Sequence, residues 1–292
     1  MKQKYVLITP CRNEGEHLPF LIKSIVEQTV QPIIWVIIDD GSTDNTPTII
    51  AQYSEKYQWI YHLRLNETKK RDIGLHLASV MNEGFNTAIE YCNQKAIKYN
   101  YLGNVDGDLV LDRTFFENLI IQLEKDPKIG IASGGTDYNI DGKILRVKTS
   151  EDEPSGGHML IRKECFDDCG GIPISYASDA VLKVKARLHG WKTKRFEENR
   201  AIEARDVNSA EGYWKGYIVK GKTSYYINHN PIHIIANIGK YSIRYPYYIG
   251  IPYFIGYIKC LLNNEKRIED PEIQLYFHNK WKDCLKKRVG KN

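Results

Sequence analysis

Short apolar runs alternate with segments of helical periodicity through the first two thirds of the chain, and this alternation is the strongest constraint on the fold. The run Ile33–Ile38 is apolar at every position, as in a central parallel strand that is covered on both faces. We expect strands at residues 6–9, 33–38, 59–63, 101–105, 129–132, 157–161 and 191–196, and helices at 18–25, 46–57, 78–91, 115–123 and 179–189. Strands that alternate with helices of this length predict a doubly wound parallel α/β sheet with right-handed crossovers.

The composition is that of a folded protein, because 42% of the 292 residues are hydrophobic and 26% are charged. The net charge of +5 is modest and the basic residues are spread along the chain, so we expect no nucleic-acid partner. The six cysteines form no disulfide framework, and residues 1–9 are too short and too polar for a signal peptide, which favours a reducing cytoplasm. Cys165 and Cys169 have no second pair at zinc-ligand spacing, so we expect both to pack in the core.

Polar clusters follow three of the expected strands, at Pro10–Glu14, Asp39–Asp44 and Asp106–Asp108. Ligands of doubly wound sheets bind at the carboxyl ends of the strands, so the three clusters are expected to line one edge. Gly41 permits a sharp turn and Thr46 can cap the next helix, so on the residues alone a well-made turn is as consistent with the second cluster as a nucleotide site. The turn between the first expected strand and the first expected helix lacks Gly-x-Gly-x-x-Gly, which argues against an NAD or FAD enzyme.

Carboxylates are concentrated at this edge, where Asp39, Asp40, Asp106 and Asp108 follow two strands. Like charges so close raise one another's pKa, and burying a bare carboxylate is costly, unless a cation lies among them. One or two carboxylates completed by phosphate oxygens are the usual ligands of Mg²⁺ or Mn²⁺. These residues therefore predict a divalent cation together with a diphosphate, and the plainer alternative is a strand-end turn with one solvated acid.

A second phosphate-binding pattern lies late in the chain. Residues Gly216–Thr223 match Gly-x4-Gly-Lys-Thr letter for letter. That loop requires a buried strand before it and a capped helix after it. The preceding residues 206–213 form no such strand, so we do not expect a nucleoside triphosphatase.

The segments "RNEGEHLPFLIKSIVEQT" and "VIIDDGSTDNT", together with the strand-end "DGD", resemble family 2 glycosyltransferases of the bacterial or archaeal envelope-polysaccharide type. The resemblance extends from residue 4 to about residue 195. It implies the GT-A fold, a Rossmann-like, mixed and mostly parallel sheet flanked by helices. By this resemblance the residues that bind the nucleotide are Pro10, Arg12, Asn13, Glu14, Asp39, Asp40 and Asp106.

The same resemblance assigns the chemistry. Asp106 and Asp108 match the Asp-x-Asp motif whose acids hold the ribose and the metal, and Asp179 matches the general base. Two positions depart from the family pattern. Ser178 precedes the base where relatives carry Glu or Trp, and Glu203 stands where many relatives carry a histidine that contributes to the metal or the diphosphate. Glu203 either adds a metal ligand or has left the site.

Arg205, two residues after Glu203, remains as a candidate contact for the diphosphate. A metal-neutralised diphosphate is already a good leaving group, so one base suffices, which predicts direct displacement with inversion. Without the family context, Asp179 is as consistent with a helix N-cap as with a general base. The alternatives are a nucleotidyltransferase of similar fold, which would need a glycine-rich phosphate loop, and a non-catalytic module that binds nucleotide or sugar.

We expect residues 1–105 to form the nucleotide-binding half of one domain, 106–205 its metal and acceptor half, and 206–292 a helical, aromatic extension. Segment 245–258 is uncharged and rich in tyrosine, too short for a membrane span of about 20 residues, and its prolines argue against one smooth helix. It suits either a membrane surface or packing over the catalytic domain. The expected substrates are a nucleotide-sugar donor and a glycan or polyprenyl-linked acceptor, handled at the cytoplasmic face of the membrane.

Overall fold

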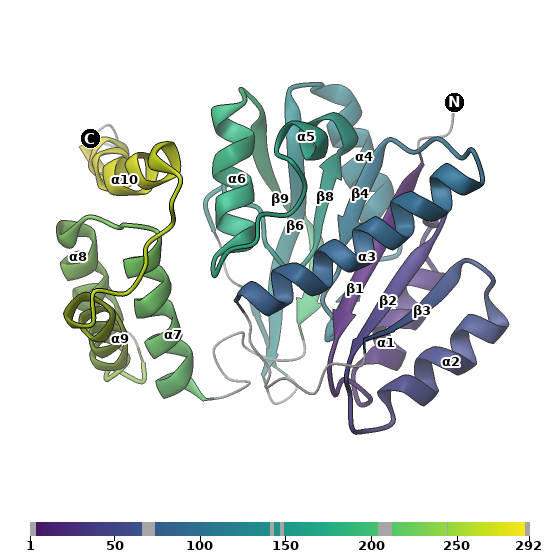
Figure 1. Cartoon of the computed structure of the whole chain (residues 1–292), viewed down its shortest axis with the longest axis horizontal. Coiled ribbons are helices and arrows are strands. Elements are labelled where there is room, and N and C mark those ends of the chain that lie inside the picture. Colours follow the sequence, from purple (N-terminus) through teal and green to yellow (C-terminus); the bar gives the residue numbers. More distant parts are fainter. Residues whose placement is uncertain are drawn as a thin grey trace. The chain divides into compact units, whose positions relative to one another are not determined.

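The computed structural model describes residues 4–65, 74–140, 143–146, 149–203, 212–243 and 245–289. The chain divides into two compact units (Figure 1). The N-terminal unit comprises Met1–Ile174 and Ser178–Arg205, and the C-terminal unit comprises Ser175–Ala177 and Asp206–Asn292. The division of labour between residues 1–105 and 106–205 stays a prediction.

The N-terminal unit is built on one mixed sheet. Its strands are β1 (Tyr5–Cys11), β2 (Trp35–Asp40), β3 (Ile60–Leu65), β4 (Tyr101–Asn104), β5 (Leu109–Leu111), β6 (Ile129–Ile140), β7 (Lys143–Arg146), β8 (Met159–Arg162) and β9 (Lys192–Glu203). They lie in the order β3-β2-β1-β4-β8-β6-β9-β5, with β7 paired to β6. Strands β1 to β4 are parallel, whereas β8 runs antiparallel to both of its neighbours, so parallel strands bring their carboxyl ends together on one edge.

Helices cover both faces of this sheet (Figure 1). They are α1 (Leu18–Val26), α2 (Thr46–Lys56), α3 (Leu75–Gln94), α4 (Phe115–Lys125), α5 (Lys163–Asp168) and α6 (Ser178–Leu188). Trp35 and Ile37 pack in a core cluster with α1, α2 and α4, whereas Val36 and Ile38 pack in a second cluster with α3, α5 and α6. Because side chains alternate along a strand, β2 is apolar on both faces, as the sequence predicts.

All the strands and helices expected from the sequence are present. Most ends differ by a few residues, but β6 and β9 continue well beyond the expected ends at residues 132 and 196. Cys165 and Cys169 are buried in the second core cluster, so the prediction that they pack in the core is confirmed. Thr46 was expected to cap α2, and this prediction is wrong. Asn45 is the N-cap without a side-chain hydrogen bond, and the Thr46 hydroxyl instead binds Glu14.

The C-terminal unit consists of α7 (Tyr213–Tyr226), α8 (Pro231–Ser242), α9 (Gly250–Leu262) and α10 (Pro271–Val289). The pattern Gly216–Thr223 lies inside α7, so it forms no phosphate-binding loop, as expected. Its second glycine has a packing role, because a Cβ on Gly221 would lie 2.0 Å from Tyr253 O of α9.

The prolines of segment 245–258 do not break the helix that its second half forms. Pro246 precedes α9 and Pro252 lies in the first turn, where proline removes no intrahelical hydrogen bond. Across the described part of the chain, no helix combines the length and the apolar character needed to cross a bilayer.

Candidate active site

Two loops at the carboxyl ends of β1 and β2 are joined by hydrogen bonds. The Asn13 backbone N–H donates to Ser42 Oγ at 2.9 Å, and Asn13 Oδ1 accepts from the Thr43 N–H at 2.8 Å. The Glu14 N–H donates to Thr46 Oγ1 at 2.9 Å. Asn13 has a φ of 56°, a left-handed conformation that asparagine tolerates better than most residues. The polar residues of the two clusters therefore bind one another and hold this edge of the sheet as one surface.

Asp39 is fully buried at the end of β2. Its Oδ1 accepts a hydrogen bond from the Ser42 N–H at 2.9 Å. Among the described residues its Oδ2 has no hydrogen-bond partner, although Arg64 Nε lies 3.4 Å away at ion-pair distance. Buried acceptors without a hydrogen bond are rare in folded proteins. Asp39 is therefore suited to accept an N–H from a ligand.

Asp40 lies between two basic side chains. Its Oδ1 is 2.8 Å from His76 Nε2 on α3, and its Oδ2 is 3.7 Å from Arg12 Nη1. The structure therefore makes partners of Asp40 and Arg12, which come from different polar clusters of the sequence. This pairing moderates the negative charge of the edge.

The Cys11 thiol, at the end of β1, responds to the carboxylates around it. Burial, followed by the carboxylates of Asp39 and Glu14, raises the pKa of the Cys11 thiol well above its ordinary value. Like charges disfavour the thiolate, so this shift shows that carboxylates from both loops act on one point of the sheet edge.

Asp106 and Asp108 follow β4, which lies beside β1 in the sheet. The Asp106 N–H donates to Gly157 O at 2.8 Å. A Cβ on Gly157 would lie 2.7 Å from Asp106 Oδ2, so a larger residue at this position would displace the carboxylate. A Cβ on Gly107 would lie 3.1 Å from Glu14 Cγ, which is also a tight contact. The cluster after β4 thus lies directly against the loop after β1.

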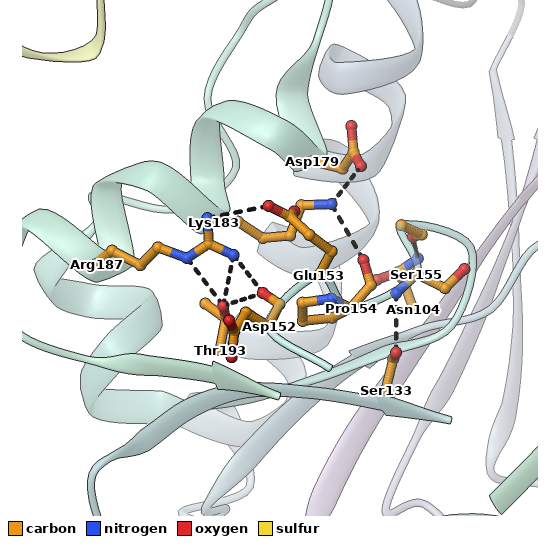
Figure 2. A network of polar contacts seen from close by, with 11 residues as sticks. Asn104, Ser133, Asp152, Glu153, Pro154, Ser155, Asp179, Lys183, Arg187 and Thr193 are labelled. Atoms are coloured by element: carbon orange, nitrogen blue, oxygen red, sulfur yellow. Dashed lines mark hydrogen bonds and ion pairs between the residues drawn. The ribbon is translucent and has the colours of Figure 1, made fainter. Parts of the chain in front are cut away.

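Residues 152–157 form a segment that we call the shelf, and Figure 2 shows the polar contacts that hold it. Its hydrogen bonds join Gly156 O to Asn104 Nδ2 (2.8 Å), the Ser155 N–H to Ser133 Oγ (2.8 Å), Pro154 O to Lys183 Nζ (3.1 Å) and Asp152 O to Thr193 Oγ1 (2.7 Å). Arg187 adds a contact of 3.3 Å from its Nη1 to Glu153 Oε1. Side chains from three strands and from α6 therefore fix the backbone of the shelf.

Asp179 lies in the first turn of α6, against the shelf. A Cβ on Gly156 would lie 2.9 Å from Asp179 Oδ2. Gly157 contacts Asp106 in the same way, and consecutive Cα atoms are only about 3.8 Å apart. The side chains of Asp106 and Asp179 therefore lie against adjacent glycines of one rigid segment.

Lys183 holds the Asp179 carboxylate. Its Nζ lies 2.9 Å from Asp179 Oδ2, and the lysine side chain is only 8% exposed while that of Asp179 is 45% exposed (Figure 2). Burial acts to raise the pKa of Asp179, but the Lys183 ammonium and the backbone N–H groups of Asp179 and Ala180 outweigh it, so the pKa lies below its ordinary value. The carboxylate is therefore ionised at neutral pH, as a general base must be.

On the interpretation of Asp179 as a general base, which the family resemblance implies, we expect Lys183→Met to move the acid limb of the pH–rate profile to higher pH. Lys183 lowers the pKa of Asp179, so its removal raises that pKa, and Asp179 is then protonated sooner as the pH falls. At pH 7 the rate should fall by about twofold or less, because Asp179 stays mostly ionised there. Initial rates of nucleoside diphosphate release between pH 4 and pH 9 measure this shift.

Lys163→Met is the matched control for this prediction. Lys163 pairs with Asp167 at 2.5 Å with the same four-residue spacing, on α5 and away from the shelf. Its removal should leave the pH–rate profile unchanged. An equal shift in both variants, or none in Lys183→Met, would show that the pairing with Lys183 does not tune Asp179.

Two further candidate residues, Glu203 and Arg205, are placed less completely than the others. Glu203 pairs with Leu109 in the sheet, next to Asp108, so its backbone lies near the Asp-x-Asp motif. Arg205 lies outside the described residues. Among the described residues, no three His, Cys, Asp or Glu side chains are grouped so that they could hold a metal ion. The metal role of Glu203 and the diphosphate contact of Arg205 stay predictions.

Three features of this site escaped the sequence analysis: the shelf glycines, Lys183 and His76. Lys183 follows Asp179 by four residues, a spacing that places two side chains on one helix face and could have suggested the pair. The dipeptide Gly156-Gly157 before a strand was a weaker signal of close backbone approach. No pattern in the sequence links His76 to Asp40.

Solved structures show the same architecture. The mannosyltransferase PcManGT from Pyrobaculum calidifontis, in complex with GDP-Man and Mn²⁺, aligns with a TM-score of 0.56 at 17% identity over 94% of this chain and 79% of that chain. S. aureus TarS 1–349 in complex with UDP aligns with a TM-score of 0.54 at 15% identity over 83% of this chain and 73% of that chain. The fold is GT-A, as the resemblance implied.

The sequence then defines the family. The profile of glycosyl transferase family 2 matches residues 6–177, and the chain belongs to this family, whose members are inverting glycosyltransferases. Poly-beta-1,6-N-acetyl-D-glucosamine synthase of Staphylococcus aureus (strain COL) is 25% identical over 204 residues, 63% of this chain and 46% of that protein. The same enzyme of Staphylococcus epidermidis is 27% identical over 143 residues, 48% of this chain and 31% of that protein. The chain thus spans less than half the length of these relatives.

Proposed function

We propose that this chain moves one sugar from a nucleotide-diphosphate sugar to a hydroxyl group of a glycan or polyprenyl-linked acceptor, with inversion, in the synthesis of envelope polysaccharide. Family membership supports the reaction class. The synthases of the two staphylococci support a polysaccharide product, and the GDP-Man and UDP complexes of the similar structures support a nucleotide-linked donor.

One observation carries this proposal: the predicted nucleotide, metal and base residues form a continuous row of contacts. Cys11 is the sheet partner of Asp39, and a Cβ on Gly107 would lie 3.4 Å from Cys11 Cβ. Asp106, which precedes Gly107, contacts Gly157 of the shelf. Gly156, the adjacent glycine of the shelf, contacts Asp179. A donor lying along this row would have its base at one end and its anomeric carbon near the other.

At the nucleotide end, the buried Oδ2 of Asp39, which has an ion-pair neighbour but no hydrogen bond among the described residues, would accept an N–H of the base. Asp40 with Arg12, and the hydrogen-bonded backbone of Pro10–Glu14, would form the wall beside it. Asp106 would accept a hydrogen bond from the ribose. The rigid, interlocked loops mean that the nucleotide meets a preformed surface.

A divalent cation fits the residues present. Asp106 and Asp108 supply hard oxygen ligands but the described residues hold no group of three such side chains, so diphosphate oxygens and water would complete the coordination of Mn²⁺ or Mg²⁺. Bound there, the cation would neutralise the charge of the leaving diphosphate. The Glu203 backbone lies beside this motif, but among the described residues its side chain forms no metal-binding group with the two carboxylates, so its metal role stays a prediction.

At the other end, the ionised Asp179 would accept the proton of the acceptor hydroxyl as its oxygen attacks the anomeric carbon. Lys183 and the shelf keep this carboxylate in one orientation. A single base on the side opposite the leaving diphosphate gives direct displacement and inversion. We place the enzyme at the cytoplasmic face of the membrane, with segment 245–258 at the lipid surface.

A thermal-shift series with uridine, guanosine and thymidine diphosphates, with and without Mn²⁺, tests the proposal. A ligand that binds only the folded state stabilises it by about 2.7 kcal/mol at 100 times its Kd. We expect one nucleoside diphosphate to raise the melting temperature in Mn²⁺ and to do so much less in EDTA. Adenosine monophosphate, which lacks the diphosphate, serves as a control. If none of the diphosphates shifts the transition, the donor assignment is wrong.

A further inference from the structure

Helix α9 has two faces of different character. On its inner face Tyr253 is buried, and its hydroxyl donates to Ser224 Oγ at 3.0 Å and accepts from Asn237 Nδ2 at 3.2 Å. Tyr257 packs beside it in the core cluster of the C-terminal unit. Both rings therefore pack in the core of this unit, and the Tyr253 hydroxyl is already bound within it.

The outer face of α9 and the neighbouring α8 expose large apolar side chains. Ile232 and Ile235 of α8 are 54% and 70% exposed, and Ile251, Phe254 and Leu262 of α9 are 55%, 45% and 79% exposed. Single exposed apolar residues are common, but soluble proteins rarely gather so many on neighbouring helices unless the surface binds something.

Positive charge is concentrated in the same part of the chain. Residues 206–292 contain 14 Lys and Arg but 7 Asp and Glu, a net charge of +7, whereas the whole chain carries +5. The first 205 residues are therefore slightly negative. A basic, apolar surface matches an anionic lipid layer, to which each nearby base contributes about 1 kcal/mol of attraction.

A pocket opens within this surface. Its volume is about 450 Å³, within the range of pockets that hold small ligands. Its apolar walls come from α8 and α9, namely Ile234, Ile235, Ile238, Phe254, Ile258 and Leu261. Because Ile235, Phe254 and Leu261 are also exposed, the apolar lining continues to the outer surface. Among the residues that the structure describes, no carboxylate lines the pocket.

Polar groups lie at one side of the pocket. Arg267 is exposed at its rim, with Nη1 bound to Asn228 Oδ1 at 2.8 Å and its guanidinium 4.7 Å from the centre of the Tyr225 ring. His229 is also in the wall, and neither of its buried ring nitrogens has a hydrogen-bond partner among the described residues. A neutral imidazole has one N–H donor, which can bind an oxygen of a ligand.

We propose that this pocket takes one hydrocarbon chain of an anionic membrane phospholipid, whose phosphate lies at Arg267 and whose oxygens accept from His229. The apolar walls bury the chain, and the exposed residues of α8 and α9 rest in the surrounding lipid. This inference does not depend on glycosyl transfer, because every residue in it belongs to the C-terminal unit.

The test is co-sedimentation of the full chain with vesicles of phosphatidylcholine alone or with phosphatidylglycerol, together with cross-linking by a phosphatidylglycerol that carries a diazirine in its acyl chain. We expect binding at least about tenfold tighter to the anionic vesicles, and cross-links within residues 231–262. Ile235→Asp with Phe254→Asp should weaken binding by about tenfold or more, since it puts charges into the apolar contact. Ile121→Asp, on a 43% exposed residue of α4, is the control.

Ile238→Trp separates pocket entry from adsorption to the surface. The larger ring fills the pocket without changing the outer residues, so it should remove most cross-links while vesicle binding falls only a few-fold. Each variant must keep the melting temperature and the nucleotide response of the wild type. Cross-links outside residues 231–262, or unchanged cross-linking in Ile238→Trp, would overturn the proposal. So would a lipid-independent dimer that Ile235→Asp with Phe254→Asp dissociates, because the face would then bind a second copy.

Discussion

Asp179→Asn is expected to lower kcat by about 10² to 10⁴ while the KM for the sugar nucleotide changes little. The asparagine keeps the size of the side chain and its place beside Gly156, but its amide cannot accept the proton of the acceptor hydroxyl. The contacts proposed for the nucleotide at Asp39 and the Asp-x-Asp motif are untouched. Initial rates of nucleoside diphosphate release at saturating donor and acceptor measure the effect, and the melting temperature with donor shows whether binding is retained.

The variant also leaves Lys183 buried without its carboxylate, which costs stability for a reason unrelated to catalysis. Asp179→Asn combined with Lys183→Met removes that charge, so it should restore stability without restoring activity. Asp167→Asn, on the exposed partner of Lys163, is the control with full activity. More than about a tenth of the wild-type rate in Asp179→Asn would place the base elsewhere.

The strands and helices of the N-terminal unit were predictable because burial imposes a period on the sequence. β2 is apolar at successive positions since it is covered on both faces, and α1 repeats apolar residues at helical spacing since only one side packs on the sheet. The positions of the polar clusters followed from the rule that parallel strands end at one edge.

Elements without such a period were missed. β5 has only three residues, and β6 continues as a strand through Gly134–Ile140, a stretch with the composition of a turn. A register shift at Gly134 and Gly135 explains the glycines, because a Cβ on Gly134 would lie 2.2 Å from Asn199 O. Such contacts join strands distant in sequence, and local patterns do not report them.

In the candidate site, too, local features were predictable from the sequence and contacts between distant segments were not. Which aspartates follow which strands was readable from the chain, but the contacts that orient them were not. Asn13 with Ser42, and the shelf glycines with Asp106 and Asp179, meet only after the sheet has formed. Their geometry depends on strand register, and one residue of slip would turn each side chain to the other face.

The cluster after β2 combines features of the two interpretations that the sequence left open. Ser42, Thr43 and Thr46 bind the loop after β1, which makes them parts of a well-built turn. Asp39 binds the same turn through Oδ1 but leaves its buried Oδ2 without a hydrogen bond. Most polar atoms of this segment therefore stabilise the turn, and the role of Asp39 Oδ2 in binding a nucleotide stays a proposal.

Asp106→Asn and Asp108→Asn are each expected to lower kcat/KM on the order of 10²- to 10³-fold, since a bound cation contributes several kcal/mol of charge stabilisation and each 1.36 kcal/mol is tenfold. The amides are poorer ligands for a hard cation than carboxylates. Each variant should also lose the Mn²⁺-dependent rise in melting temperature with nucleoside diphosphate, a measurement that does not require turnover.

The melting temperature of the ligand-free protein distinguishes metal binding from a structural role. Removing one negative charge from an edge that also carries Asp39 and Asp40 relieves repulsion, so the ligand-free variants should be as stable as the wild type or more so. A lower melting temperature without ligand, with the Mn²⁺ response intact, would mean that these aspartates hold the fold and not the cation. Asp112→Asn, an exposed residue at the end of β5, should change neither quantity.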